Sequence, residues 1–325
     1  MPTRPLGATG LQVSPVGLGV AALGRPAYID LGREADLGAD RSVDALERRC
    51  HQVLDAAWSS GVRYLDAARS YGRAEAFLAS WLRSRRLDPS EVTVGSKWGY
   101  TYVGDWRMDA DTHEVKDHSL AALTRQAAET RSLLGDHLDL YQVHSATLDS
   151  GILEDRAVLD ELAHLRDQGV VIGLSSSGPA QADTIRRALE IATAGAAPFA
   201  SVQATWNLLE QSAAPALAAA KASGWGVVIK EALANGRLPT LDTDQHTAAL
   251  LTASAAGAGA PLDAFALAGA LSQPWADVVL LGAATVGQLH SNLQALRTAA
   301  DELPLPAVAE PPEDYWARRA ARSWT

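Results

Sequence analysis

The 325-residue sequence predicts an α/β fold in which eight strands close into one (β/α)8 barrel, also called a TIM barrel. Two observations lead to this prediction. Short apolar segments of strand length alternate along the chain with longer segments of helical periodicity. Several of the short segments are apolar almost throughout, which is typical of parallel strands covered on both faces. Because the alternation continues nearly to the end, residues 1–325 are expected to form a single domain.

Composition restricts the classes of protein to consider. The formal net charge of -10 argues against a nucleic-acid or anionic-membrane surface. Cys50 is the only cysteine, which excludes an internal disulfide framework and a thiolate metal cluster. No run of eighteen apolar residues is long enough to cross a bilayer, and the first ten residues lack the pattern of a signal peptide. The expectation is a soluble cytoplasmic protein, with a homo-oligomer possible.

The N-terminal part predicts a short preface to the barrel. Residues 4–17 are expected to form two short strands joined by a glycine-bearing turn, and residues 16–20 the first barrel strand. Residues 22–41 have an irregular composition and predict a loop. From Ser42 to Ser60 a serine cap precedes an apolar stripe, which indicates a helix.

The rest of the chain repeats the strand and helix signals. Further strands are predicted at 63–67, 92–97, 138–144, 170–175, 201–206, 226–230 and 277–281. Helices are predicted near 73–84, 118–134, 153–168, 179–193, 211–223, 261–272 and 286–298. A doubly wound open sheet is the alternative, but no Gly-x-Gly-x-x-Gly follows the first strand to hold a pyrophosphate. The barrel is therefore the more economical interpretation.

Two C-terminal segments need separate interpretation. The Gly/Ala-rich run 252–260 is predicted to be a loop before the helix that starts near Pro261. Residues 311–322 begin with two prolines and acidic residues and end with arginines, which is typical of a short helix with a favourable dipole. That helix is expected to lie over the barrel.

Four ionisable residues lie at or just beyond the ends of three successive strands. Asp66 ends one strand and Tyr71 follows in the next loop, while Lys97 and His144 end the two strands after it. Each residue taken singly has an ordinary explanation, such as a solvated lysine or a hydrogen-bonded histidine. Barrel enzymes carry their active sites at the C-terminal ends of the strands, so the four together indicate a catalytic site.

Their chemistry suits acid–base catalysis. A phenol has an ordinary pKa near ~10, and a neighbouring ammonium is expected to lower it. A carboxylate beside the lysine would fix the ammonium, and a histidine would orient a carbonyl oxygen. Such a phenol can protonate a forming alkoxide or deprotonate an alcohol. A Schiff-base isomerase or aldolase using Lys97 is a competing hypothesis, although Asp66 favours the charged lysine. No metal-binding motif and no Gly-x-Ser-x-Gly elbow is present.

Several motifs together resemble the aldo-keto reductase family. They extend over nearly the whole chain: residues 4–14, Asp66 with Tyr71, Gly72 and Glu75, Ser96-Lys97, residues 139–144, residues 172–175, Val202-Gln203, and residues 281–292. The resemblance implies nicotinamide-dependent interconversion of a carbonyl compound and its alcohol. It implies that Tyr71 is the general acid and base, that Lys97 and Asp66 tune it, and that His144 orients the carbonyl. A non-catalytic regulatory relative that binds the cofactor is the alternative.

The resemblance also implies a cofactor site, with some departures from the family pattern. Ser175 and Gln203 match positions that contact the carboxamide, but Ser176 stands where asparagine is frequent. Lys230 occupies a position where many members have an aromatic residue on the nicotinamide. The expected adenosine end has no Lys or Arg, so NAD(H) and NADP(H) both remain open; its residues are Gly282, Thr285, Gln288 and Asn292.

The substrate pocket is assigned to the region after the third strand. Trp98 and Trp106 are predicted to contact the substrate, and the polar run 111–118 to line the pocket. Its charged and histidine-bearing character suits a hydroxylated carbonyl compound such as a sugar. No metal is expected to take part.

Overall fold

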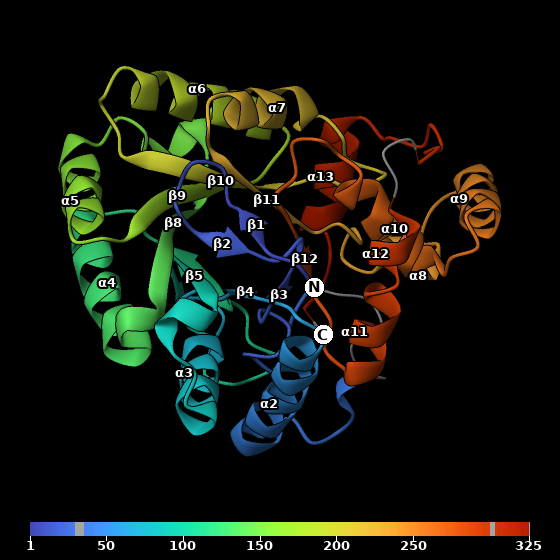
Figure 1. The fold of residues 1–325 in the computed structure, drawn as a ribbon, viewed down its shortest axis with the longest axis horizontal. Coiled ribbons are helices and arrows are strands. Elements are labelled where there is room, and N and C mark those ends of the chain that lie inside the picture. The colour runs from blue at the N-terminus through green and yellow to red at the C-terminus, as the bar shows by residue number, and fades with distance from the viewer. Residues whose placement is uncertain (30–35, 300–302, 325) are drawn as a thin grey trace.

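The computed structural model describes residues 1–29, 36–299 and 303–324, and its centre is a closed barrel of parallel strands (Figure 1). Around the barrel the strands follow the order β3-β4-β5-β8-β9-β10-β11-β12, with β12 paired to β3. Their bounds are Val16–Gly19, Tyr64–Asp66, Thr93–Trp98, Leu138–Ala146, Val171–Ser176, Phe199–Thr205, Gly226–Lys230 and Val278–Leu281. This confirms the predicted eight-stranded barrel.

The barrel interior combines one large ring with small residues. Tyr64 is fully buried, and Gly17 and Gly95 face it from the two neighbouring strands. A Cβ at Gly17 would lie 2.6 Å from Tyr64 Cδ1, and one at Gly95 would lie 2.7 Å from its Oη. The absence of side chains at these glycines therefore makes room for the ring inside a closely packed barrel.

Helices surround the barrel, each turning an apolar face inward (Figure 1). In α2, for example, Leu46, Cys50 and Leu54 are buried and Ser42 caps the first turn. The helices that follow barrel strands are α2 (Val43–Ser59), α3 (Ala74–Arg85), α4 (Leu120–Leu134), α5 (Arg156–Asp167), α6 (Gln181–Thr193), α7 (Ala214–Ala222), α10 (Leu262–Leu271) and α11 (Val286–Asn292). Shorter or additional helices are α8 (Arg237–Thr240), α9 (Gln245–Gly257), α12 (Ala295–Thr298) and α13 (Pro312–Ala320).

Two hairpins lie at opposite ends of the barrel. The predicted N-terminal hairpin consists of β1 (Arg4–Pro5) and β2 (Gln12–Val13). It lies across the centre of the ring in Figure 1, where Leu6 and Val13 join a buried cluster with Tyr64 and so close the floor. A second hairpin, β6 (Tyr100–Tyr102) and β7 (Glu114–Lys116), follows β5 at the other end and was not predicted from the sequence.

Most predicted helices and strands are confirmed to within a few residues, with two corrections. The prediction of a loop over 252–260 is wrong for its first part, because α9 continues to Gly257. Asp244 caps this helix, and alanine, the strongest helix former, outweighs the breaker signal of the glycines. The predicted helix 286–298 is interrupted between α11 and α12. Of the predicted loop 22–41, residues 30–35 lie outside the described residues, and residues 22–29 form turns and bends.

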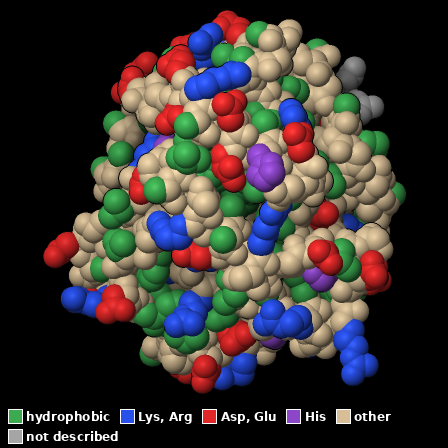
Figure 2. Space-filling view, turned by 90° about the vertical axis from the view of Figure 1, so that its left-hand side faces the viewer, with side chains coloured by type: hydrophobic (Ala, Val, Ile, Leu, Met, Phe, Trp, Pro, Cys, Tyr) green, Lys and Arg blue, Asp and Glu red, His purple; other side chains and the backbone are tan. Residues whose placement is uncertain are grey.

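Charges of both signs are interspersed on the face shown in Figure 2, with no large area of a single sign. Within the described residues, no single helix is long and apolar enough to cross a membrane, although α9 and α10 meet the length and composition criteria as a pair bent by 81°. Most of α10 is buried in the hydrophobic core of this protein.

Candidate active site

The loop that carries Tyr71 joins the tip of β4 to the first turn of α3. Asp66 ends β4, and Tyr71 N donates to Ala68 O at 3.1 Å in the following turn. Gly72 adopts a left-handed φ of 60°, which glycine accepts without strain, and α3 begins two residues later. An ion pair from Arg69 to the buried Glu75 ties this loop to α3. The phenol is thus held in a short, well-anchored loop.

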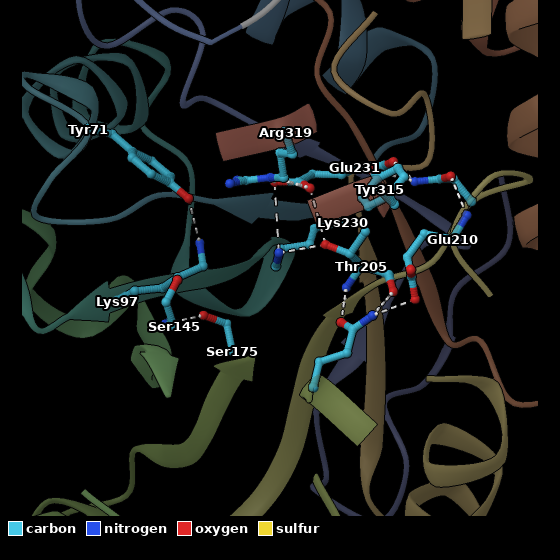
Figure 3. A network of polar contacts seen from close by, with 12 residues as sticks. Tyr71, Lys97, Ser145, Ser175, Thr205, Glu210, Lys230, Glu231, Tyr315 and Arg319 are labelled. Carbon is cyan, nitrogen blue, oxygen red and sulfur yellow. Dashed lines mark hydrogen bonds and ion pairs between the residues drawn. The ribbon is translucent and has the colours of Figure 1, made fainter. Parts of the chain in front are cut away.

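Lys97 and Asp66 form a buried ion pair at the centre of the strand ends. Their side chains are 0% and 3% exposed, and the ammonium also donates to Ala67 O at 3.0 Å. Lys97 Nζ lies 3.5 Å from Tyr71 Oη, as Figure 3 shows. Gln203 Nε2 donates to the other carboxylate oxygen of Asp66 at 2.9 Å. The structure therefore brings the predicted tyrosine, lysine and aspartate together.

The phenol is a protonated group in this environment. Burial raises the pKa of Tyr71 above its ordinary value, the Asp66 carboxylate raises it further, and Arg25 acts in the opposite direction. The expectation of a lowered Tyr71 pKa is therefore wrong for the protein without ligand, because burial and the Asp66 carboxylate together outweigh the opposing charge of Arg25. A neutral phenol is the state that can donate a proton.

His144 completes the group from the neighbouring strand β8. Its ring meets the Tyr71 ring edge-on with 5.5 Å between centroids, and its Nδ1 lies 3.4 Å from Ser70 Oγ. Burial and the nearby Lys97 ammonium hold the pKa of His144 well below its ordinary value. The imidazole is therefore neutral at neutral pH, with one ring N–H available as a donor.

The predicted carboxamide-binding residues lie at the ends of β9 and β10. Ser175 is fully buried and its Oγ accepts a hydrogen bond from Ser145 N at 2.8 Å. Ser176 is also fully buried, and its Oγ has no hydrogen-bond partner among the described residues. Gln203 is turned toward Asp66, as described above. Of these three side chains, Gln203 contacts Asp66, and no hydrogen bond joins Ser175, Ser176 and Gln203 to one another among the described residues.

Lys230 belongs to a polar cluster between the tip of β11 and helix α13 (Figure 3). Its Nζ donates to Thr205 Oγ1 at 2.7 Å and lies 3.8 Å from Glu231 Oε1. Arg319 makes a two-pronged ion pair with the same carboxylate. Burial lowers the pKa of Lys230 to about 8, whereas Arg319 and then Lys230 hold the pKa of Glu231 at about 2 against burial.

The predicted adenosine end is flanked by carboxylates. Gln288 Nε2 donates to Asp36 Oδ2 at 2.7 Å, and Asn292 Nδ2 donates to Asp263 Oδ2 at 2.8 Å. Thr285 caps α11, and Gly282 is exposed at the tip of β12 with no atom within 4 Å of where a Cβ would stand. Neither Lys nor Arg is among these contacts.

The loop after β11 is a feature that sequence reasoning did not single out. Glu231, Ala234 and Asn235 all have positive φ values between 51° and 56°. Such backbone is costly for residues with a Cβ and is concentrated at ligand-binding loops. Asn235 Oδ1 is buried without a hydrogen-bond partner among the described residues. The Asn-Gly pair at 235–236 is the sequence signal that was available for this turn.

The two tryptophans assigned to the substrate pocket have packing roles. Trp98 is fully buried, with its ring 5.7 Å from that of His118, and its contact with a substrate stays a prediction. Trp106 donates from Nε1 to Arg41 O at 2.8 Å and meets Phe77 edge-on. Only the first half of the predicted polar run, residues 111–114, borders a hollow of approximately 590 Å³, whose other lining residues are Tyr100, Met108, Asp109, Ala110 and Trp324.

Among the described residues, no group of three or more His, Cys, Asp or Glu side chains is arranged to hold a metal ion. The titratable side chains at the strand ends are instead paired with one another, as in Lys97 with Asp66.

Comparison with known proteins gives matches of sequence over part of the chain. The uncharacterized oxidoreductase YqkF of Bacillus subtilis (strain 168) is 30% identical over 184 residues, which cover 55% of this chain and 50% of that protein. Pyridoxal 4-dehydrogenase of Microbacterium luteolum is 32% identical over 43% of this chain and 42% of its own length. D-threo-aldose 1-dehydrogenase of a Pseudomonas species is 28% identical over 57% and 60%. The chain thus spans about half the length of the first of these relatives and less of the second.

Solved structures match over nearly the whole chain. A putative aldo-keto reductase from Pseudomonas aeruginosa has a TM-score of 0.66 and 27% identity, with 92% of this chain and 95% of that chain covered. An aldo-keto reductase from Bacillus halodurans in its holo form has a TM-score of 0.66 at 22% identity, a likeness of fold alone, over 98% and 96%. The sequence model of the aldo/keto reductase family matches residues 36–305. With this barrel and this match, the chain belongs to the aldo/keto reductase family.

Proposed function

We propose that this protein is a nicotinamide-dependent oxidoreductase that interconverts an aldehyde, ketone or sugar carbonyl with its alcohol. The observation that carries the proposal is the contact of the Tyr71 phenol with a lysine that is itself ion-paired to Asp66. The neutral His144 ring lies against the same phenol. This arrangement provides a proton donor, a cation beside it and a second donor at one end of the barrel.

Each side chain has a distinct task in reduction. A nicotinamide cofactor bound at the strand ends would supply the hydride that the carbonyl carbon receives. Tyr71 donates its phenolic proton to the carbonyl oxygen as charge develops there, and the Lys97 ammonium stabilises the phenolate that remains. Asp66 compensates the charge of Lys97 and fixes its position. His144 orients the carbonyl through a ring N–H. In oxidation the phenolate accepts the proton from the alcohol.

The ends of β9 to β12 support the cofactor assignment. Ser176 Oγ and Asn235 Oδ1 are buried polar atoms without partners among the described residues, which suits a polar ligand. The strained loop after β11 lies beside the open backbone at Gly282 on the neighbouring strand. We infer that Ser175, Ser176 and Gln203 hold the carboxamide end, Lys230 the phosphate region beside the ring, and Gly282, Thr285, Gln288 and Asn292 the adenosine end.

The substrate is a small carbonyl compound that enters beside the β6–β7 hairpin. Tyr100 lies 5.0 Å from the His144 ring and also borders the hollow beside that hairpin. The names of two relatives, pyridoxal 4-dehydrogenase and D-threo-aldose 1-dehydrogenase, favour an aldehyde or sugar. Asp111 and Glu114 at the hollow suit a ligand with hydroxyl groups. Trp106 belongs to this region as a wall behind the hairpin.

The competing functions predict different chemistry. A Schiff-base mechanism needs a neutral lysine, whereas Lys97 is ion-paired and fully buried. A non-catalytic cofactor-binding relative would have no need of the proton donor, so replacing Tyr71 would have no effect on its function.

A single variant tests the proposed function. Tyr71→Phe keeps the ring and its packing but removes the proton, so turnover with a panel of aldehydes, ketones and aldoses is expected to fall by roughly 10²-fold or more. Cofactor dissociation constants, measured by tryptophan fluorescence with NADH and NADPH, are expected to stay within about twofold of the native values. Full activity of pure Tyr71→Phe protein, or no turnover of any panel member by the native protein, would contradict the proposal.

A further inference from the structure

Arg25 lies in a second loop that fits closely against the loop of Tyr71. This loop follows β3, and Gly24 O accepts a hydrogen bond from Arg73 N at 2.7 Å. A Cβ at Gly24 would lie 2.3 Å from Tyr71 O, so the two backbones approach as closely as a glycine allows. The next residue, Arg25, is therefore held directly against the loop that carries Tyr71.

The Arg25 side chain is buried and is held by polar contacts. It is only 2% exposed, and its Nη1 donates to Ser70 O at 2.9 Å. The same nitrogen lies 2.8 Å from Glu114 Oε2 in the β6–β7 hairpin. Arg25 thus binds the carbonyl of the residue directly before Tyr71 and joins the catalytic loop to the hairpin.

Aromatic rings surround the guanidinium group. Its carbon lies 5.2 Å from the centre of the Tyr71 ring, 5.0 Å from that of Tyr28 and 4.4 Å from that of Trp324. Trp324 is itself stacked on His113 with 4.4 Å between ring centres. These contacts keep the charge over the phenol, because the ring faces attract the cation.

We propose that Arg25 is a positioning residue for Tyr71, holding the Ser70 carbonyl and keeping a permanent positive charge over the phenol ring. This inference rests on the proposed function, in which Tyr71 moves the proton. Lys97 is already compensated by Asp66, so Arg25 is a second cation that stabilises the phenolate formed in each turnover. A guanidinium group stays charged throughout the accessible pH range, so its contribution does not titrate.

Glu114 acts on the phenol with the opposite sign. Arg25 lowers the pKa of Tyr71 and Glu114 raises it, within the larger effects of burial and Asp66. The charged and titratable groups that face the phenol from the elements around it are Arg25, Asp66, Lys97, Glu114, His144 and Glu231, with Tyr28 beside Arg25. Removing the charge of Arg25 or of Glu114 should therefore change proton transfer in opposite directions, which a purely structural role would not do.

The test compares Arg25→Met, Arg25→Lys and Glu114→Gln in the full-length protein. Arg25→Met is expected to lower kcat by roughly ten- to a hundredfold, because the phenol loses both its position and the nearby charge. Arg25→Lys should restore part of this loss. Glu114→Gln keeps an acceptor for Arg25 and is expected to raise kcat for alcohol oxidation at pH 9, because a lower Tyr71 pKa increases the fraction of phenolate. The pH–rate profile of alcohol oxidation should therefore move to higher pH in Arg25→Met and to lower pH in Glu114→Gln.

Arg63→Met is the matched control. Arg63 also donates to backbone carbonyls and lies over an aromatic ring, that of Trp58, but it stands at the opposite end of the barrel, just before β4. The isotope effect from cofactor deuterated at the transferred hydrogen should grow in Arg25→Met and stay unchanged in the control. Cofactor dissociation constants should remain within about twofold in all variants.

Three results would overturn the inference. The first is a native kcat and a native isotope effect in Arg25→Met. The second is an equal loss of kcat per folded molecule in Arg25→Met and Arg63→Met, and the third is a shift of the pH–rate profile with the same sign in Arg25→Met and Glu114→Gln. The Tyr71→Phe variant separates this failure from that of the proposed function. If Tyr71→Phe is inactive and Arg25→Met is normal, only the role of Arg25 is wrong. If Tyr71→Phe is active, the proposed function itself fails.

Discussion

The largely buried ammonium of Lys230 affects both the pH dependence of folding stability and the binding of a charged cofactor. Its side chain is 15% exposed and its hydrogen bond to Thr205 holds it at the mouth of the barrel. The nearest carboxylate, Glu231, is shared with Arg319, so Lys230 receives only part of its compensation. Burial makes the protonated amine less stable here than in water, and Glu231 offsets this only in part, so the pKa of Lys230 falls to about 8.

The sign of the resulting pH effect follows from the two protonation states. Between about pH 8 and the ordinary lysine pKa of 10.5, the unfolded chain keeps the proton on Lys230 and the folded chain has lost it. The free energy of unfolding therefore rises with pH over this window, by an expected 1–3 kcal/mol (about 1.4 kcal/mol per pKa unit). In Lys230→Met this rise should disappear, and the variant should equal or exceed the native stability at pH 7.5. Urea unfolding of both proteins at pH 7.5 and pH 10 measures the difference, and parallel pH dependences would contradict it.

The same residue also bears on cofactor selectivity. A charged amine near the nicotinamide would repel the oxidised ring, whereas a neutral one would not. The observed contacts with Thr205 and Glu231 direct the amine to protein partners. The structure therefore favours a role for Lys230 in the polar cluster over a direct stacking role at the ring.

At the scale of elements, α13 is joined to the barrel by a strong and a weak ion pair on consecutive residues. Arg319 makes a two-pronged contact with the buried Glu231, whereas Arg318 is 59% exposed and contacts Glu310, which Arg237 already binds. Of the two ion pairs, only that of Arg319 compensates a carboxylate that has no second arginine partner and is largely removed from water. Their contributions to stability should accordingly differ.

Arg319→Met is expected to lower the free energy of unfolding by about 2–3 kcal/mol at pH 7, because Glu231 keeps its charge in a buried place. Arg318→Met should change it by less than about 0.5 kcal/mol. The pKa of Glu231 is held at about 2, below its ordinary value, so this stabilisation is complete above pH 4.5 and is lost as pH falls toward 2. Urea unfolding at pH 7 and pH 3 checks both statements; equal losses in the two variants would refute them.

Helix α11 leads to a prediction about cofactor choice. Gln288 contacts Asp36, and Asn292 contacts Asp263, so the surroundings of the expected adenosine end carry negative charge. Carboxylates can accept hydrogen bonds from ribose hydroxyl groups but repel a 2′-phosphate. NADH is therefore expected to bind roughly ten- to a hundredfold more tightly than NADPH.

Asp36→Ser should reduce this preference, whereas Asp40→Asn, at an exposed carboxylate four residues further along the chain, should leave it unchanged. Dissociation constants for the two reduced cofactors provide the measurement. A strong native preference for NADPH would show that a cation from another part of the chain reaches the 2′-phosphate.

At the scale of the whole molecule, the barrel could be predicted from the sequence because each strand is a short continuous segment with apolar residues on both faces. Val94, Leu140 and Ile172, for example, lie in runs that no solvent-exposed strand would contain. The proximity of the four candidate residues Asp66, Tyr71, Lys97 and His144 could be predicted for a related reason, because parallel strands in a barrel all end on one face and residues at their ends meet there. The sequence could not show how strongly burial and the neighbouring charges oppose one another at Tyr71. The predicted lowering of its pKa was wrong for this reason.

Long-range contacts explain the other omissions. Arg25 and Glu114 are separated along the chain, and only the close fit of two loops shows that both face one phenol. The contact of Trp324 with Arg25 joins the C-terminal segment to the loop after the first barrel strand. Helix α9 was not predicted because the glycines near its C-terminal end were given more weight than the alanines before them.

The pairing of β12 with β3 has a consequence for how the protein must fold. The first and the last barrel strands are neighbours, so the ring has two open edges until the chain has been made as far as Leu281. Loop-closure entropy opposes such a distant contact, and parallel pairing of this kind forms slowly. An unfinished ring exposes unpaired backbone groups along both edges, which is a template for aggregation. Tyr71 follows β4, the strand next to β3, and would therefore lie close to one of those edges. The geometry of the candidate site and the protection from aggregation would then both be completed late in folding, when the ring closes.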